Sequence, residues 1–409
     1  MKIPKTYKIS KCRLCNSKNL KNIQNFWNIY VSNFVKKKDI NKGIKAPLKL
    51  VYCLNCKLLQ LEHSAPQEIM YKKYYWYKSG ITKTMRDSLH ELKQDIKKNC
   101  KLKKGDVILD IGANDGTLLS YFKKDKMITI GCEPANNLQK ELKKNCDYVI
   151  HDFWDSKKLT KIPLKHRKLK VITAIGMFYD LEDPSKFIKD AADSLDKDGI
   201  FVAQLMCSHS MFKMNDLGNI CHEHLEYYSY DSLKYLFEKN GLKIFKISEN
   251  NVNGGSYRVY CKKNLKKSVS YPEKTSLKDI KKFVKNVIDN RTKTLKFLKD
   301  AKKENKTIML YGASTKGNTL LQYYGITPKL IKFAVERSKH KWGKYTIGSG
   351  LKIISEQESR KLNPDYFYVM PYGFIDEFIK REKKWLKKGG KFLMPYPKFK
   401  VVKWKKLLF

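Results

Sequence analysis

Two pairs of cysteines near the start of the chain constrain its fold more than any other feature. The first pair is Cys12 and Cys15, and the second is Cys53 and Cys56, each with the spacing C-x2-C. A C-x2-C turn presents two sulfurs from one short loop, and two such turns complete a tetrahedral zinc site. Four sulfur ligands leave no position for water, so we expect a structural Zn²⁺. The alternative is four unrelated buried thiols.

The other six cysteines are scattered without such pairing, as is typical of reduced core residues in an intracellular protein. The first ten residues, MKIPKTYKIS, are polar and basic, unlike a secretory signal. No apolar run approaches the roughly 18 residues that cross a bilayer. We therefore expect a cytoplasmic protein with no membrane association.

The formal net charge of +45 ordinarily suggests a nucleic acid or an anionic membrane as partner. The lysines, however, are spread evenly from Lys2 to Lys406, and Asn and Ile are also abundant. This pattern fits an AT-rich coding bias, so a nucleic acid partner is not favoured. A positive field would still attract a small substrate that carries phosphate. The sequence leaves open whether the chain is a monomer or a homodimer.

The 409 residues are enough for two or three domains, and their patterns divide into three segments. Residues 1–68 hold the cysteine pairs and short strands. Residues 69–264 begin with an aromatic-rich stretch and continue with five buried strands separated by helices, then a helix and a hairpin. Residues 265–409 begin with a long amphipathic helix and continue as a second α/β unit.

The order of elements in the central segment is that expected of a class I methyltransferase sheet, which is Rossmann-like. We therefore expect an α/β protein with a zinc-binding head, a central methyltransferase domain and a C-terminal α/β domain that binds substrate. Two α/β units on one chain can face each other across a cleft, which is a usual place for a ligand.

A glycine-rich turn, DIGANDG at 110–116, follows the first strand of the central segment. Glycines let the backbone turn tightly and approach a ligand closely. A dinucleotide site would need G-x-G-x-x-G, whereas this turn reads G-x-N-x-G and favours S-adenosylmethionine over NAD. The residues expected to bind this cofactor are Asp110, Gly112, Asn114, Gly116, Glu133 and Asp152.

Two of these acids have more specific expected roles. Glu133 ends the next strand, where its carboxylate could accept both ribose hydroxyls, and Asp152 follows the third strand, where it could meet the adenine amine. The alternatives are that Asp110 caps the turn and that Glu133 is a surface acid.

The densest cluster of proton-transfer groups is CHEHLEYYS at 221–229. It is not the zinc motif H-E-x-x-H, because Glu226 stands where the second histidine would be. If the stretch is extended, His222 and His224 share a face and Glu223 points the other way. An imidazole with a pKa near neutrality can remove and return a proton, as chemistry beside a carbonyl requires. The alternative is two histidines that cap a helix start.

Two further glycine-containing turns are candidates for substrate binding. NVNGGSYR at 251–258 exposes backbone amides and carries an arginine suited to phosphate or hydroxyl groups, although it also fits an ordinary hairpin turn. GASTKGN at 312–318 lies where a strand meets a helix N-terminus, which binds anions, and it lacks the spacing of a Walker loop. The residues expected to bind substrate are Asn253, Gly254, Arg258, Ser314, Lys316 and Asn318.

Taken in order, these motifs resemble those of the zinc-containing sugar C-methyltransferases. That family acts on nucleotide-linked 4-keto deoxysugars and includes the 3-C-methyltransferases that make branched sugars. The resemblance spans essentially the whole chain and rests on CRLC, YCLNC, DIGANDGTLL, CHEHLEYYS, NGGSYRV, YGASTKGNTLL and VERSKHKWGKYTIGSG.

The resemblance implies that a histidine removes the proton beside the keto group and that the enolate carbon attacks the methyl group of S-adenosylmethionine. On that precedent His224 is the base, Glu223 and His222 orient it or the sugar, and Tyr77 lies near the sugar. Two positions differ from the family pattern. Cys221 replaces a tyrosine before H-E-H, and Asp180 replaces a histidine after the fourth strand.

Two other functions fit parts of the sequence. O- or N-methylation of a related sugar would need only a base for a hydroxyl, or a free amine. A zinc-knuckle protein that modifies or holds RNA is the third possibility, and the even lysine spread and the H-E-H cluster argue against it.

Overall fold

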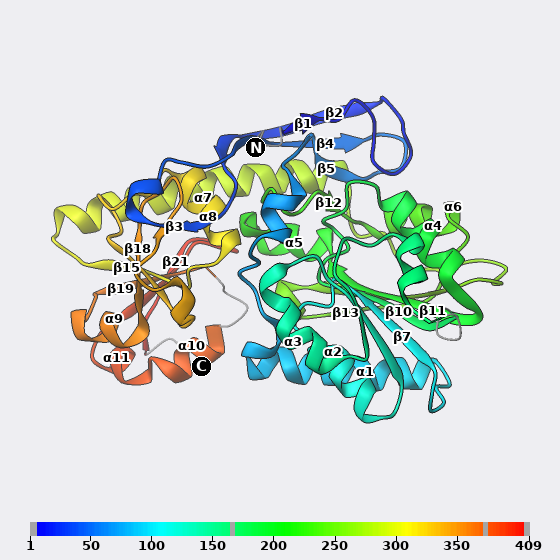
Figure 1. The fold of residues 1–409 in the computed structure, drawn as a ribbon. Coiled ribbons are helices and arrows are strands. Elements are labelled where there is room, and N and C mark those ends of the chain that lie inside the picture. The colour runs from blue at the N-terminus through cyan, green and yellow to red at the C-terminus, as the bar shows by residue number, and fades with distance from the viewer. Residues whose placement is uncertain (1–5, 164–167, 371–374, 405–409) are drawn as a thin grey trace.

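The computed structural model describes residues 6–163, 168–370 and 375–404. The strands of this described part form four sheets. In Figure 1 the N-terminal head lies across the top, the central α/β region lies on the right and the C-terminal α/β region lies on the left. The long helix α7 (Leu277–Lys303) runs beside the head toward the C-terminal region.

The head is built on a four-stranded sheet in the order β12-β5-β4-β2. Apolar residues alternate along β4, so one face of this strand is buried. β12 comes from the central segment and pairs antiparallel with β5, which places Glu226 opposite Gln60. The strands of this sheet are β2 (Leu20–Tyr30), β4 (Lys45–Cys53), β5 (Leu59–Leu61) and β12 (Glu226–Tyr227). The head also contains β1 (Tyr7–Lys8) and β6 (His63–Ser64), which pair with each other, and β3 (Phe34–Val35), which joins another sheet.

The central region contains a seven-stranded sheet in the order β13-β14-β11-β10-β7-β8-β9. Strands β7 to β11 are parallel, and the hairpin of β13 and β14 completes one edge in antiparallel fashion. This order confirms the predicted methyltransferase-like sheet. The strands are β7 (Val107–Ile111), β8 (Ile128–Cys132), β9 (Tyr148–Ile150), β10 (Leu169–Ile175), β11 (Leu195–Met206), β13 (Lys243–Asn250) and β14 (Ser256–Lys262).

Helices cover both faces of the central sheet, because side chains alternate along its buried strands. Ile108 and Val202 pack with α1, α2 and α3 on one face, and Leu109 and Phe201 pack with α4 and α6 on the other. The helices are α1 (Lys83–Asn99), α2 (Thr117–Lys124), α3 (Gln139–Asn145), α4 (Pro184–Ser194), α5 (Ser208–Met214) and α6 (Tyr230–Lys239).

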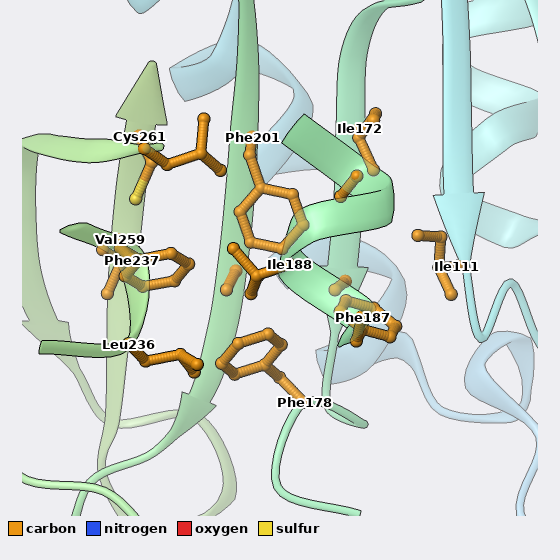
Figure 2. Packing of buried hydrophobic residues seen from close by; sticks show 14 of the residues in the cluster. Ile111, Ile172, Phe178, Phe187, Ile188, Phe201, Leu236, Phe237, Val259 and Cys261 are labelled. Atoms are coloured by element: carbon orange, nitrogen blue, oxygen red, sulfur yellow. The ribbon is translucent and has the colours of Figure 1, made fainter. Parts of the chain in front are cut away.

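Aromatic packing on the second face fixes the loop that follows β10. Figure 2 shows Phe178, Phe187, Phe201 and Phe237 gathered between the sheet and helices α4 and α6. The Phe178 and Phe237 rings stack with centroids 5.7 Å apart. Because Phe178 is fully buried, the residues that follow it are held at the carboxyl end of the sheet.

The C-terminal region contains an eight-stranded sheet in the order β21-β20-β19-β15-β16-β18-β17-β3, and its last strand comes from the head. Its other strands are β15 (Ile308–Tyr311), β16 (Phe333–Glu336), β17 (Tyr345–Thr346), β18 (Lys352–Ser355), β19 (Tyr366–Val369), β20 (Lys391–Met394) and β21 (Lys400–Val402). Its helices are α8 (Thr315–Tyr324), α9 (Glu356–Leu362), α10 (Ile375–Arg381) and α11 (Lys383–Lys387).

The three regions exchange strands, so the segments 1–68, 69–264 and 265–409 do not correspond to separate sheets. β12 joins the sheet of the head, and β3 joins the C-terminal sheet. One apolar cluster also contains Phe26 of the head, Phe283 of α7 and Leu320 of α8. Within the described residues, no helix has the length and apolar character to span a membrane.

A buried ion pair joins the first cysteine turn to the central region. Arg13 donates to the Leu61 carbonyl oxygen (2.5 Å) and to Ser64 Oγ (2.9 Å), and its Nε lies 3.7 Å from Glu226 Oε1. Glu226 Oε2 accepts a hydrogen bond from the Leu181 N–H (3.3 Å). Both charged side chains are almost fully buried, so each depends on the other.

Replacing Arg13 by methionine should lower the free energy of unfolding by about 3–5 kcal/mol, because Glu226 would remain as an unpaired buried charge. Denaturant unfolding followed by circular dichroism measures the change. Lys11→Met removes a neighbouring exposed charge and should change the free energy by less than about 0.5 kcal/mol. The double variant Arg13→Met, Glu226→Leu should regain much of the loss. Equal instability of the single and double variants would contradict the ion pair as the cause.

Candidate active site

A cavity of about 630 Å³ opens at the carboxyl ends of strands β7, β8, β10 and β11. Loops at this edge of a parallel sheet are the usual ligand site of α/β folds. Residues between 71 and 89 also line the cavity, as do the first residues of α8. The central and C-terminal regions therefore form the cavity together.

The glycine-rich turn borders the cavity with two residues in the left-handed region, Gly112 (φ 72°) and Asn114 (φ 53°). A Cβ at Gly112 would lie 2.7 Å from Cγ of Met177, whose side chain also lines the cavity. Gly116 precedes α2, and a Cβ there would meet Asn145 instead. Gly116 therefore shapes the helix start but does not line the cavity, contrary to its predicted contact with the cofactor.

Two buried carboxyl groups hold the turn and face the cavity. Asp110 accepts a hydrogen bond from Thr173 Oγ1 (2.6 Å), and burial raises its pKa to about 7. The two oxygens of Glu133 accept from the N–H groups of Asn114 (2.9 Å) and Ala135 (2.8 Å), and burial raises its pKa. Each Glu133 oxygen retains a lone pair. These buried acceptors at the edge of the cavity therefore fit an adenosyl ligand with ribose hydroxyls.

Asp152 also lines the cavity, but basic side chains surround it. Its carboxylate lies 3.0 Å from Lys158 Nζ and 3.7 Å from Lys72 Nζ. Burial alone would raise the pKa of Asp152, but Lys158 and the Phe153 N–H lower it below its usual range. Asp152 is therefore ionised at neutral pH, and its contact with adenine remains a prediction.

The aromatic-rich segment around Tyr77 is tied down over the glycine-rich turn. Asn114 Nδ2 donates to the Tyr77 carbonyl oxygen (3.2 Å), and its Oδ1 accepts from the Ser79 N–H (3.0 Å). Asn137 makes a similar pair of bonds, 2.8 and 3.0 Å long, with the backbone of Tyr75. Tyr77 is 46% exposed as a residue, yet burial of its phenol raises the pKa. These contacts place Tyr77 at the wall of the cavity, and its position near the sugar remains a prediction.

Residues 221–225 form a turn rather than a strand, because the His224 N–H bonds back to the Cys221 carbonyl oxygen (3.1 Å). His224 and Glu223 line the cavity. His222 is fully buried against the head, where its Nε2 bonds to the Ala46 carbonyl oxygen (2.9 Å). The stretch is not extended, so the condition under which His222 and His224 would share a face is not met. His222 stabilises the junction with β4 and does not line the cavity.

One ring nitrogen of His224 is fixed by the backbone. Its Nδ1 lies 2.8 Å from the Asn219 carbonyl oxygen. A carbonyl only accepts, so Nδ1 carries the proton and Nε2 carries the lone pair. Burial, and then the charge of Lys316, lower the pKa of His224 well below its usual value. At neutral pH the ring is an uncharged base that borders the cavity.

Asn219 connects this histidine to the C-terminal region. Its Oδ1 accepts a hydrogen bond from Lys316 Nζ (2.8 Å), and its Nδ2 donates to Asp216 Oδ2 (3.0 Å). Lys316 is the second residue of α8, so the C-terminal region places a positive charge near the base. Neither Asn219 nor Asp216 belongs to a recognisable motif, and no local pattern in the sequence identifies them.

Two of the predicted substrate residues point away from the cavity. Arg258 extends from β14 toward α1, where Glu91 (2.7 Å) and Asp95 (3.3 Å) bind its guanidinium. Asn318 is fully buried and donates to the Asn33 carbonyl oxygen (3.1 Å). The prediction that these two side chains bind substrate is therefore wrong. The predicted substrate residues that do line the cavity are Asn253, Gly254, Ser314 and Lys316.

The two cysteine pairs converge at one point in the head, as predicted. The Sγ atoms of Cys12, Cys15, Cys53 and Cys56 all lie within 4.8 Å of one another. The distances from Cys12 to Cys56 and from Cys15 to Cys53 are both 3.5 Å. Four sulfurs at roughly 2.3 Å from zinc would be separated by about 3.8 Å, so this cluster fits a tetrahedral Zn²⁺. Gln60 Nε2 donates to the Cys12 sulfur (3.2 Å), which orients this ligand.

Three family models match successive parts of the chain. Residues 12–71 match a zinc binding domain, residues 79–247 match a methyltransferase domain, and residues 251–397 match a C-methyltransferase C-terminal domain. A similar curated protein is the C-methyltransferase NovU of Streptomyces niveus, which is 24% identical over 408 residues. The alignment covers 96% of this chain and 97% of NovU.

Solved structures similar to this chain include an S-adenosylmethionine-dependent methyltransferase from Clostridium acetobutylicum, with 13% identity and a TM-score of 0.35. That match covers 45% of this chain and 93% of the other. The magnesium protoporphyrin IX methyltransferase of Synechocystis, solved with bound SAH, is 10% identical with a TM-score of 0.36. It covers 46% of this chain and 90% of the other.

Replacing Lys316 by methionine should raise the pKa of His224, because the charge that disfavours the imidazolium is removed. Titration of the histidine ring protons by NMR measures this pKa without a substrate. Lys329→Met, which removes an exposed lysine beyond α8, should leave it unchanged. An unchanged pKa in Lys316→Met would contradict the electrostatic contact.

Cys12→Ser should reduce bound zinc from about one ion per chain to near zero and should lower the melting temperature or the soluble yield, because a structural zinc contributes to stability. Atomic absorption and thermal unfolding measure the two effects. Cys100→Ser alters a cysteine outside the cluster and should retain the zinc. A soluble Cys12→Ser variant of normal stability that lacks metal would contradict the structural role.

Proposed function

We propose that this S-adenosylmethionine-dependent methyltransferase acts on carbon and that its substrate is a nucleotide-linked 4-keto deoxysugar. The matches to a C-methyltransferase C-terminal domain and to the C-methyltransferase NovU support this proposal. In this proposal the acceptor is a carbon beside the keto group, and His224 is the base that forms the enolate. The observation that carries the proposal is the position of His224, an unprotonated imidazole on the wall of the cavity that the cofactor turn borders.

The cofactor would lie at the carboxyl ends of β7 and β8. Glu133 would accept hydrogen bonds from the ribose hydroxyls, and Asp110 with Gly112 would form the turn beside them. When bound, S-adenosylmethionine supplies an electrophilic methyl group. The segment around Tyr77, held by Asn114, would keep water away from the cofactor and the sugar.

His224 would take the proton from the sugar carbon at Nε2. The Asn219 carbonyl oxygen holds Nδ1–H, which fixes the ring and supports the positive charge that develops on it. The lowered pKa keeps Nε2 free of a proton throughout the neutral range. It also favours return of the proton to solvent after the reaction.

The start of α8 supports a substrate that carries phosphate. Ser314 caps this ten-residue helix by accepting from the Gly317 N–H (2.9 Å), and both residues line the cavity with Lys316. A helix N-terminus with free N–H groups and a lysine attracts anions. The net charge of +45 would raise the local concentration of such a substrate.

Proton exchange separates carbon methylation from O- or N-methylation. The enzyme with S-adenosylhomocysteine and dTDP-4-keto-6-deoxyglucose in D2O should incorporate deuterium at the carbon beside the keto group, as read by mass spectrometry. O- or N-methylation involves no enolate and predicts no exchange. Exchange at the background rate, together with methyl transfer to oxygen or nitrogen, would refute the proposal.

His224→Ala should lower methyl transfer and deuterium exchange by about 10²–10⁴-fold, the usual contribution of a general base. Calorimetric affinity for S-adenosylhomocysteine should stay within about threefold, because the ring does not bind the cofactor. His90→Ala, which changes an exposed histidine on α1, should retain both activities. Normal turnover in His224→Ala would remove His224 as the base.

A further inference from the structure

The cavity contains a carboxyl group to which the reaction described above assigns no role. Asp180 follows Phe178 in the loop after β10, lines the cavity and is only 9% exposed. Its Oδ1 atom has no hydrogen-bond partner among the described residues. Gln67 Nε2 donates to the Asp180 carbonyl oxygen (3.0 Å), and the packing of Phe178 anchors the same loop (Figure 2). The Tyr71 hydroxyl lies close enough to this carboxyl group to lower its pKa. Asp180 is therefore fixed in the wall of the cavity with a buried, unpaired Oδ1 atom.

Two other carboxyl groups act on Asp180. Glu223 lines the same cavity, and its Oε2 also lacks a partner in the described part of the chain. Glu226 lies next to Arg13 and accepts a hydrogen bond from the N–H of Leu181, the residue after Asp180. Burial, then Glu223, then Glu226 raise the pKa of Asp180 well above its usual range. Burial also raises the pKa of Glu223 and that of Glu226. Because neighbouring buried carboxyl groups cannot all be ionised at low energetic cost, the shift of Asp180 favours its neutral form.

The positive charge near Asp180 does not reverse this effect. Lys316 lowers the pKa of Asp180, but its effect is smaller than those of burial, Glu223 and Glu226, which raise this pKa. The Lys316 ammonium donates a hydrogen bond to Asn219 Oδ1 (2.8 Å). The Cys221 thiol is buried, and burial raises its pKa. Four phenols nearby are also neutral, because burial raises their pKa values: Tyr71, Tyr75, Tyr179 and Tyr227. Burial likewise raises the pKa of Glu182 in the same loop and lowers that of His224.

We propose that Asp180 is a catalytic residue that donates a hydrogen bond from its neutral carboxyl group to the keto oxygen of the substrate as the enolate forms. This assignment rests on the proposed function and supplies the partner that the developing oxyanion needs. Tyr179 links Asp180 to His224. Its ring centroid lies 4.5 Å from that of His224, and Asp180 is the next residue in the chain. The acid and the base therefore border one cavity from adjoining segments.

The proposed step balances without a further reactant. His224 Nε2 takes the proton from carbon, the C–H electron pair forms a carbon–carbon double bond, and the carbonyl π pair moves onto oxygen. The Asp180 O–H remains intact and donates to that oxygen, whose negative charge grows during the step. An ionised carboxylate there would repel the same charge. One such donor in a site without water contributes about 10²–10³-fold to the rate.

A different use of Asp180 would require the opposite protonation state. An ionised Asp180 could bind an ammonium group on the substrate, and Glu223 could share that charge. The unpartnered Oδ1 alone is compatible with both uses. Glu223 beside Asp180 favours the neutral acid. A site for a cation would require both carboxyl groups to be ionised in the empty cavity, where the two negative charges would repel each other.

Two variants with side chains of similar size to aspartate test whether the Asp180 carboxyl group is protonated and donates a hydrogen bond. Asp180→Asn keeps a donor but does not titrate, and Asp180→Leu removes the donor. With dTDP-4-keto-6-deoxyglucose, kcat of the wild type should fall as the pH rises through the raised pKa. In Asp180→Asn that alkaline limb should disappear, and kcat at neutral pH should stay within about tenfold. Asp180→Leu should lose about 10²–10³-fold in kcat with little change in KM.

Binding of S-adenosylhomocysteine confirms that each variant is folded, and Glu182→Gln provides a control in the same loop that should keep the alkaline limb. Infrared difference spectra of the substrate-free enzyme should contain the carbonyl band of a protonated carboxyl group that Asp180→Asn removes. Absence of this band, or an Asp180→Asn variant as inactive as Asp180→Leu, would overturn the proposal. A wild type that shows the band but neither exchanges nor methylates the sugar would refute the proposed substrate instead.

Discussion

The pairing of β12 with β5 is the constraint on which the rest of the site depends. It ties the chain directly after His224 to the zinc-binding head, and the buried pair of Arg13 and Glu226 crosses the same junction. The N–H groups of residues 225 and 226 both bond to the Tyr179 carbonyl oxygen, at 2.8 and 3.1 Å. The base and the loop of Asp180 are thus fixed to each other and to the cysteine turn. A zinc ion held by the four cysteines would in this way support the position of His224.

The features that were predicted correctly from the sequence are local ones. The cysteine spacing, the alternation of buried strands and helices and the glycine-rich turn depend on neighbouring residues, and each has a characteristic pattern. The exchanged strands β3 and β12 were not predicted, because a two-residue strand carries no periodicity and pairs with a distant part of the chain. The expected contact of Arg258 with substrate fails because of a similarly distant interaction. Its partners Glu91 and Asp95 on α1 are 167 and 163 residues earlier in the chain.

The H-E-H stretch shows how a correct choice of residues can come with the wrong geometry. An extended strand would have placed both histidines on one face, but a turn begins at Cys221 and reverses the chain. Ser229 then caps the start of α6 with a capping box, so only a short segment, which includes β12, joins this turn to the helix. His222 consequently completes the contact with the head, and Glu223 and His224 face the cavity. The surroundings of each side chain in the folded protein distinguish His222, which has a structural contact, from His224, which is a candidate base.

The electrostatics of the cavity shift its two candidate proton-transfer groups in opposite directions. Burial disfavours any charged form, so it lowers the pKa of His224 and raises that of Asp180. Lys316 increases the first shift, and Glu223 increases the second. A neutral base and a neutral acid can therefore coexist over the same pH range, which is the combination that enolisation of a ketone requires. A charged pair in their place would attract each other and would be poorly suited to act on opposite ends of a carbonyl group. The replacement of a histidine by aspartate at position 180 is thus compatible with the reaction, provided that the carboxyl group keeps its proton.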